Sequence, residues 1–202
     1  MKMSISIFIS YLALYLVIYL HEIGHALLYY KYGCKKNWWQ VTVKPYLFFS
    51  TPLPVDMEKA RLLNRKQNIF IASGGIGINL IFAMLTFLIL QRINQNYYIG
   101  LFLHQFLTLH LGEAVSYLII GNVYLVSDME VIAKSKAILR PLYFVFGLFV
   151  GLFYMLFLIG MPEEYKSIIV AFNAMTILCM GVGRIVFTVI HNKRLNNHQY
   201  DN

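Results

Sequence analysis

Five long apolar stretches constrain this chain more than any other feature of its sequence. A helix that crosses a membrane needs about 20 mainly apolar residues, because the hydrocarbon core is about 30 Å thick and a helix rises about 1.5 Å per residue. The stretches that meet this requirement are residues 4–30, 68–90, 98–126, 141–160 and 167–190. Lipid cannot satisfy open backbone groups, so each stretch is predicted to be helical. The sequence therefore predicts an all-α polytopic membrane protein with about five transmembrane helices.

The composition excludes an ordinary soluble domain and a disordered chain. Apolar residues make up 59% and charged residues 13%, whereas a typical soluble domain has roughly 45–50% and 25%. Phenylalanine and tyrosine together number thirty, which disordered segments do not contain. The two cysteines lie far apart, so neither a disulfide framework nor a cysteine-rich zinc ribbon is indicated. With no repeat or linker, residues 1–202 are predicted to form a single membrane domain.

The formal charge of +8 is explained by topology. Basic residues gather in residues 31–66, after the third apolar stretch and in the C-terminal tail, with eight, three and two of them respectively. An N-terminus outside and a C-terminus in the cytoplasm would place all three segments on the inner side. This arrangement disfavours a nucleic-acid partner, and the small compact core favours a prokaryotic cell membrane.

Between the first two apolar stretches, residues 40–49 are rich in β-branched and aromatic side chains. Pro45, Pro52 and Pro54 punctuate this region. The pattern predicts a short strand or hairpin at the membrane surface.

Within the first apolar stretch lies the sequence His21-Glu22-Ile23-Gly24-His25, an H-E-x-x-H motif. On a helix, histidines four residues apart lie on one face, so both imidazoles can reach the same Zn²⁺ ion. Glu22 is then placed to take a proton from a metal-bound water. The alternative, three polar residues capping a helix near the headgroups, is disfavoured because ionisable groups within an apolar helix are costly.

With this motif inside an apolar helix, the chain resembles the site-2-type family of intramembrane zinc metalloproteases. In that family a later helix carries glycines followed by an asparagine, as residues 72–79 do here (ASGGIGIN), and a third helix ends in an Asn…Asp-Gly motif. The third stretch ends in GNVYLVSDME, residues 121–130, with Asn122 and Asp128 in the corresponding places. The expected prolines are absent, the gap to Asp128 is shorter, and Met129 replaces the glycine, as in a shorter Ser-Asp branch of the superfamily.

The resemblance implies a role for several of these residues. It covers the core, residues 4–135, while the two additional helices at 141–190 have no counterpart. It implies that Asp128 completes a zinc site with His21 and His25. The charge-derived topology independently puts Asp128 at a depth similar to that of the histidines.

Alternatives stay open for the third ligand and for both asparagines. Glu113, three residues after His110 on one helical face, is the main competing ligand, and Glu130 is another. Asn122 and Asn79 are candidates for contacts with the substrate or the developing oxyanion. The alternatives are a helix-terminal hydrogen bond for Asn122 and helix packing for Asn79.

These residues predict an intramembrane zinc metalloendopeptidase that hydrolyses peptide bonds of membrane-embedded or membrane-associated proteins and peptides. One rival is a catalytically inactive membrane regulator that keeps the motif for stability. The other is a metal-handling or transport protein, in which the deeper His104, His110 and Glu113 would form a path.

Overall fold

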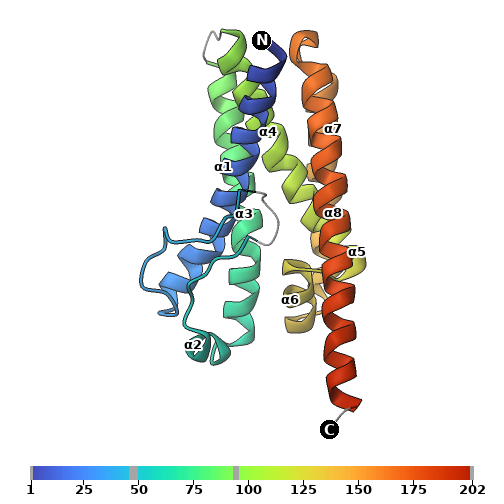
Figure 1. The fold of residues 1–202 in the computed structure, drawn as a ribbon. Coiled ribbons are helices and arrows are strands. Elements are labelled where there is room, and N and C mark those ends of the chain that lie inside the picture. The colour runs from blue at the N-terminus through green and yellow to red at the C-terminus, as the bar shows by residue number, and fades with distance from the viewer. Residues whose placement is uncertain (1, 46–49, 93–95, 201–202) are drawn as a thin grey trace.

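The computed structural model describes residues 2–45, 50–92 and 96–200, and the described part is dominated by long helices (Figure 1). The long elements are α1 (Lys2–Lys31), α3 (Arg65–Leu90), α4 (Tyr97–Val115), α7 (Leu139–Ile159) and α8 (Glu163–Tyr200). Helix α4 continues through a π-helix, η1 (Ser116–Gly121), into the single turn of α5 (Asn122–Tyr124), and α2 (Met57–Arg61) and α6 (Asp128–Ser135) are short.

Five of the described helices are long and apolar enough to cross a membrane, which confirms the predicted fold class. The membrane-spanning segments are Lys2–Lys31, Arg65–Leu90, Tyr97–Tyr124, Leu139–Ile159 and Glu163–Gly183. The chain is an all-α polytopic membrane protein.

Helix α3 begins three residues before the predicted boundary because its polar start is capped. Asn64 and Gln67 form a capping box, in which Asn64 Oδ1 accepts from Gln67 N at 3.0 Å and Gln67 Oε1 accepts from Asn64 N at 2.8 Å. These two bonds satisfy backbone donors that would otherwise be left open at the end of the helix. Hydrophobicity alone therefore underestimates the length of α3.

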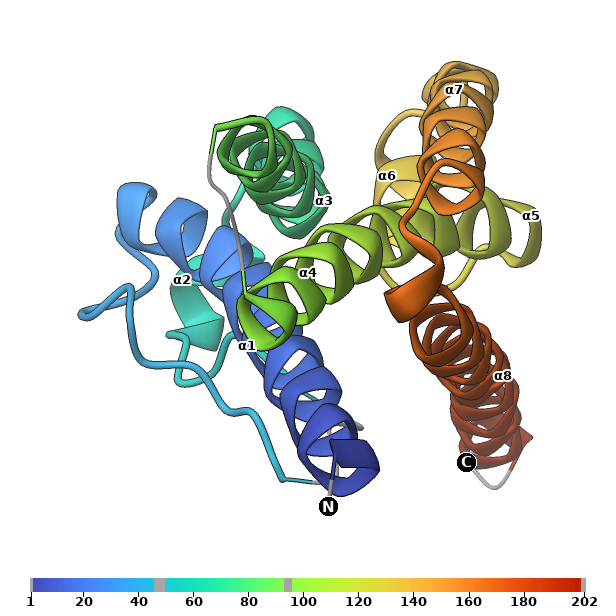
Figure 2. The same cartoon turned by 90° about the horizontal axis from the view of Figure 1, so that it is seen from above.

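Helix α4 lies at the centre of the bundle, with α1 and α3 on one side and α7 and α8 on the other (Figure 2). In the membrane-spanning segment that contains it, 78% of the most apolar window is buried, compared with 17–28% in the other four. Its faces belong to three apolar clusters. The largest joins it to α3, α6 and α7, and the second joins it to α1. The third joins it to the start of α8 and to the connection that precedes α8.

Helices α1 and α3 cross at two glycines whose backbones are in direct contact. A Cβ on Gly74 would lie 2.6 Å from the carbonyl oxygen of Gly24, and a Cβ on Gly24 would lie 2.7 Å from the carbonyl carbon of Gly74. Such distances leave no room for a methyl group. Small residues of this kind allow membrane helices to approach closely.

Helices α7 and α8 are joined to α4 by a polar network within the membrane-spanning segments. Asn173 on α8 accepts from the hydroxyl of Tyr154 at 3.2 Å and donates to Thr108 Oγ1 at 3.1 Å. All three side chains are buried, and hydrogen bonds between helices are one of the forces that hold such bundles together. The two additional helices therefore form part of the bundle.

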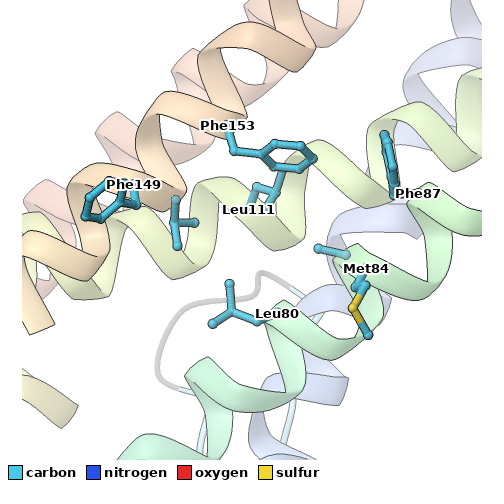
Figure 3. Close-up of a pocket in the computed structure, with 8 residues that line it drawn as sticks. Leu80, Met84, Phe87, Leu111, Phe149 and Phe153 are labelled. Carbon is cyan, nitrogen blue, oxygen red and sulfur yellow. The ribbon is translucent and has the colours of Figure 1, made fainter.

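An apolar cavity of about 300 Å³ lies between α3, α4 and α7 (Figure 3). Its lining residues are Leu80, Ala83, Met84, Phe87, Leu111, Phe149, Val150 and Phe153. A hydrogen bond of 2.7 Å between Ser73 and Tyr143 joins α3 to α7, as does an aromatic contact between Phe87 and Phe153. The lining side chains are all apolar, so they provide no acid or base for a catalytic reaction.

The segment between α1 and α3 runs alongside the lower part of α1 (Figure 1). Of the predicted hairpin at residues 40–49, positions 46–49 lie outside the described residues. In the described part, the pairing is a single antiparallel bridge between Thr42 and Thr51, with N–H to carbonyl bonds of 2.9 and 3.0 Å. The Lys35 ammonium group donates to the backbone carbonyls of Pro52 and Pro54 at 2.7 Å each, which holds the residues that follow the bridge in place. Burial lowers the pKa of this amine.

Replacing Gly74 by alanine should destabilise the bundle by about 1–3 kcal/mol, because the added methyl group must push α1 away from α3. Gly77→Ala is the matched control, since a Cβ on Gly77 meets nothing within 4 Å. Reversible unfolding in detergent micelles measures both. Equal stability of the two variants would contradict the proposed backbone contact.

Candidate metal centre

His21 and His25 lie one turn apart on the buried face of α1, as the H-E-x-x-H spacing predicts. Their side chains are among the most buried polar groups of the helix, and their Nε2 atoms are 3.1 Å apart. The rings are nearly perpendicular, with centroids 4.8 Å apart and an interplanar angle of 77°. Both imidazoles therefore direct the same nitrogen toward one point.

Asp128 reaches that point from α6. Its Oδ2 atom lies 3.5 Å from His21 Nε2 and 3.4 Å from His25 Nε2, and it has no hydrogen-bond partner among the described residues. Burial raises the pKa of this carboxyl, but the neighbouring rings of His25 and His21 outweigh that effect and hold the pKa below its usual range. Asp128 therefore offers an anionic oxygen to the same point as the two imidazole nitrogens.

Two residues with positive φ turn the chain from α5 into α6. Leu125 has a φ of 51° and Ser127, which immediately precedes the carboxylate residue, has a φ of 56°. Such values are uncommon for residues other than glycine, and they occur often at functional sites. This turn returns the chain toward α1 and brings Asp128 to the histidines.

Within the described ranges, His21, His25 and Asp128 form the one group of three potential ligands that could hold a metal ion. Their ligand atoms all lie within 4.8 Å of one another. Two imidazole nitrogens and a carboxylate oxygen form the kind of three-residue donor set that leaves one metal position open to water or substrate.

Residues of α3 and η1 hold the two imidazole rings in place. His25 Nδ1 lies 2.6 Å from the carbonyl oxygen of Ile71 on α3 and donates to it, which leaves Nε2 as the nitrogen with a free lone pair. Tyr117 on the π-helix stacks on His21, with ring centroids 4.6 Å apart and an interplanar angle of 10°. π-helical turns are frequent at functional sites.

Gly75 on α3 is also part of the site, because the two imidazoles pack directly against its backbone. A Cβ at this position would lie 2.5 Å from His21 Nε2 and 2.6 Å from His25 Nε2. Nothing in the sequence singled out Gly75 within the glycine run, or Tyr117, as part of this site. The only signal for Gly75 was its position in a run of small residues on a membrane helix.

Glu22 and all three potential ligands line one pocket of about 250 Å³. The glutamate side chain is buried, with 7% of its surface exposed. The other lining residues are Tyr29, Ser50, Pro52, Asn68, Ile71, Ala72, Tyr117, Ser127 and Val131. Glu22 therefore shares a pocket with the three potential ligands. The walls of this pocket come from α1, α3, η1, α6 and the segment that includes Ser50.

The remaining candidates lie outside this group of ligand atoms. Glu113 is buried in α4, and Glu130 forms an ion pair with Lys134 at 2.6 Å. The side-chain amide of Asn122 donates to the backbone carbonyl of Arg140 at 2.9 Å, and the backbone carbonyl of Asn122 accepts from the Arg140 guanidinium at 2.9 Å. The side chain of Asn122 thus joins α5 to α7, and its contact with substrate stays a prediction.

Asn79 lies behind the site and links it to His110, whereas His104 is bonded within its own helix. The amide of Asn79 is next to Nδ1 of His21 and Nδ1 of His110. His104 donates from Nδ1 to the carbonyl of Gly100 at 2.7 Å.

Removal of the Asp128 carboxylate should weaken zinc binding by more than about 100-fold, because loss of even an outer partner of a metal site costs 10–100-fold. Competition with a chromogenic chelator on purified Asp128→Ala measures this. Glu113→Ala is the matched control and should bind zinc like the wild type. Loss of zinc from Glu113→Ala but not from Asp128→Ala would reverse the assignment.

Gly75→Ala should also lose zinc, because the methyl group would occupy space now filled by the two imidazoles. Gly77→Ala, two residues further along α3 and with open space around it, should retain zinc. Bound metal is measured by mass spectrometry on purified protein. Full zinc occupancy in Gly75→Ala would show that the rings do not need this close packing.

The site as a whole unites α1, α3, η1 and α6 around three convergent ligand atoms and one further acid. No family model, no curated protein and no solved structure matches the chain.

Proposed function

We propose that this chain is an intramembrane zinc metalloendopeptidase. Its substrates are membrane-embedded or membrane-associated proteins and peptides. The observation that carries the proposal is the convergence of His21 Nε2, His25 Nε2 and Asp128 Oδ2 in the pocket that Glu22 also lines.

The distances between the ligand atoms suit a zinc ion. Tetrahedral zinc binds nitrogen and oxygen at about 2.0–2.2 Å, which places pairs of ligand atoms about 3.4 Å apart. The three ligand atoms here are separated by 3.1, 3.4 and 3.5 Å. Three protein ligands are typical of catalytic zinc, whereas structural zinc usually has four.

When bound, zinc would polarise the carbonyl of the scissile peptide and lower the pKa of a water molecule. His21, His25 and Asp128 would hold it, and Glu22 would act as general base and then general acid. In the first role Glu22 takes a proton from the attacking water, and in the second it delivers that proton to the leaving amine. A substrate helix must unwind locally, because its backbone has to reach the bottom of a pocket of about 250 Å³.

The proposed location is a prokaryotic cell membrane, with the N-terminus outside and the C-terminus in the cytoplasm. Support comes from the arrangement of the segments that carry most of the basic residues. Helices α2 and α6 and the C-terminal end of α8 lie at one end of the bundle, and the N-terminus lies at the other (Figure 1). The positive-inside rule assigns the basic end to the cytoplasm.

Replacing Glu22 by glutamine should lower proteolysis by about 100- to 10,000-fold while zinc stays bound, because the base is lost and the ligands are kept. New protein N-termini are compared in membranes of cells that express the wild type, Glu22→Gln or Glu163→Gln. The last variant alters an exposed acid at the start of α8 and should cleave normally.

The same Glu22→Gln variant, with zinc flux measured beside the new N-termini, separates the rival functions. An inactive regulator would generate no new N-termini in the wild type, and Glu22→Gln would then change nothing. A metal transporter would show zinc flux that depends on His104, His110 or Glu113 and is unaffected by Glu22→Gln. Either result would contradict the proposed protease.

A further inference from the structure

We infer that Asn79 is a positioning residue of the metal centre, and this inference rests on the proposed zinc site. Its side-chain amide orients the His21 imidazole so that the Nε2 lone pair faces the metal. The sequence had suggested helix packing or contact with substrate for this asparagine. The structure instead places it on the side of His21 that faces away from Asp128.

The Asn79 amide lies between two imidazoles from different helices. Its Nδ2 atom is 3.1 Å from Nδ1 of His21 on α1, and its Oδ1 atom is 3.0 Å from Nδ1 of His110 on α4. The side chains of Asn79 and His110 are fully buried and that of His21 is 2% exposed, so solvent supplies no alternative partner. Asn79 therefore connects α1, α3 and α4 through its two polar atoms.

Metal binding dictates which end of the amide must face His21. A neutral imidazole carries one proton, so a His21 ring that binds a cation through Nε2 is protonated at Nδ1 and needs an acceptor there. Rotation of the amide by 180° exchanges oxygen and nitrogen with little change of shape. In the metal-binding arrangement Asn79 Oδ1 accepts from His21, and Asn79 Nδ2 donates to His110 Nδ1.

Both histidine ligands then have an oxygen acceptor behind them. His25 donates to the carbonyl of Ile71 at 2.6 Å. With the amide rotated, His21 donates to Asn79 Oδ1 in the same way. Metal-binding histidines almost always donate their second ring N–H in this way, because the bond fixes both the tautomer and the orientation of the ring. Both acceptors belong to α3, on either side of the close glycine contact.

His110 keeps the amide in place. Its ring packs against Phe106, with centroids 4.4 Å apart, and stacks on Phe82 at 5.7 Å. Its Nε2 atom has no hydrogen-bond partner in the described part of the chain, so its polar contact is the one with Asn79. A histidine held by aromatic rings and bonded to Asn79 limits the amide to orientations that serve both imidazoles.

Asn173 provides a matched comparison within the same protein. It is also a buried asparagine in a membrane-spanning segment, but it bonds Tyr154 and Thr108 and contacts no metal ligand. A general loss of helix packing should affect variants at both positions. A loss of zinc should be specific to variants at Asn79.

Zinc affinity of the full-length protein in detergent, measured by competition with a chromogenic chelator, tests the inference. Asn79→Leu should weaken zinc binding by about 10- to 100-fold, because the acceptor for His21 is lost. Asn79→Asp should stay within about threefold of the wild type, because its carboxylate oxygens can accept from both rings. Asn173→Leu should bind zinc normally.

Each of the other outcomes is decisive. Wild-type affinity in Asn79→Leu, with zinc lost in His21→Ala, would overturn the role of Asn79 and leave the zinc site standing. Equal loss in the Leu and Asp variants would show a role in packing only. A wild-type protein that binds no zinc would overturn both the inference and the proposed function.

Discussion

The contact between Gly24 and Gly74 is the constraint on which the candidate metal centre depends. Because neither residue has a side chain, the backbones of α1 and α3 touch at this point. The contact lies within the motif on α1, between His21 and His25. As a result, several groups of α3 come within reach of the two imidazoles: the Ile71 carbonyl, the Gly75 backbone and the Asn79 amide. A wider crossing would leave the rings without these partners and free to turn.

The position of Asp128, the proposed third ligand, depends on a change of chain direction at the end of the central helix. The segment that begins as α4 loosens into a π-helix, which places the Tyr117 ring on His21. The chain then turns through Leu125 and Ser127, both with positive φ, before α6 begins at Asp128. Buried Met129 and Ile132 belong to the same apolar cluster as residues of α3, α4 and α7. Packing of α6 thus stabilises a turn that would be unfavourable by itself.

Much of the fold could be predicted from the sequence, because membrane thickness and the cost of open backbone groups leave few choices for an apolar stretch. The placement of His21 and His25 on one face followed from helical periodicity in the same way. The Asn64–Gln67 capping box was missed because hydropathy does not register polar helix starts. Tyr117 could not be placed because it lies within a π-helix, and hydropathy does not indicate where an α-helix changes into one. The hydrogen bonds of Asn122 could not be predicted, because the partner of an amide depends on which helix comes to lie beside it, here α7 with Arg140.

The choice between Asp128 and Glu113 also has a physical basis. Glu113 belongs to the most buried membrane-spanning segment, where a carboxylate that bound zinc would draw the metal into the interior of the bundle. Asp128 lies just beyond the end of that segment and is partly exposed. The proposed hydrolase would need water as well as a metal, and α6 and the segment that includes Ser50 are both outside the membrane-spanning helices. A ligand supplied from this end keeps the pocket next to water while α1 and α3 hold the two histidines at the level of the membrane.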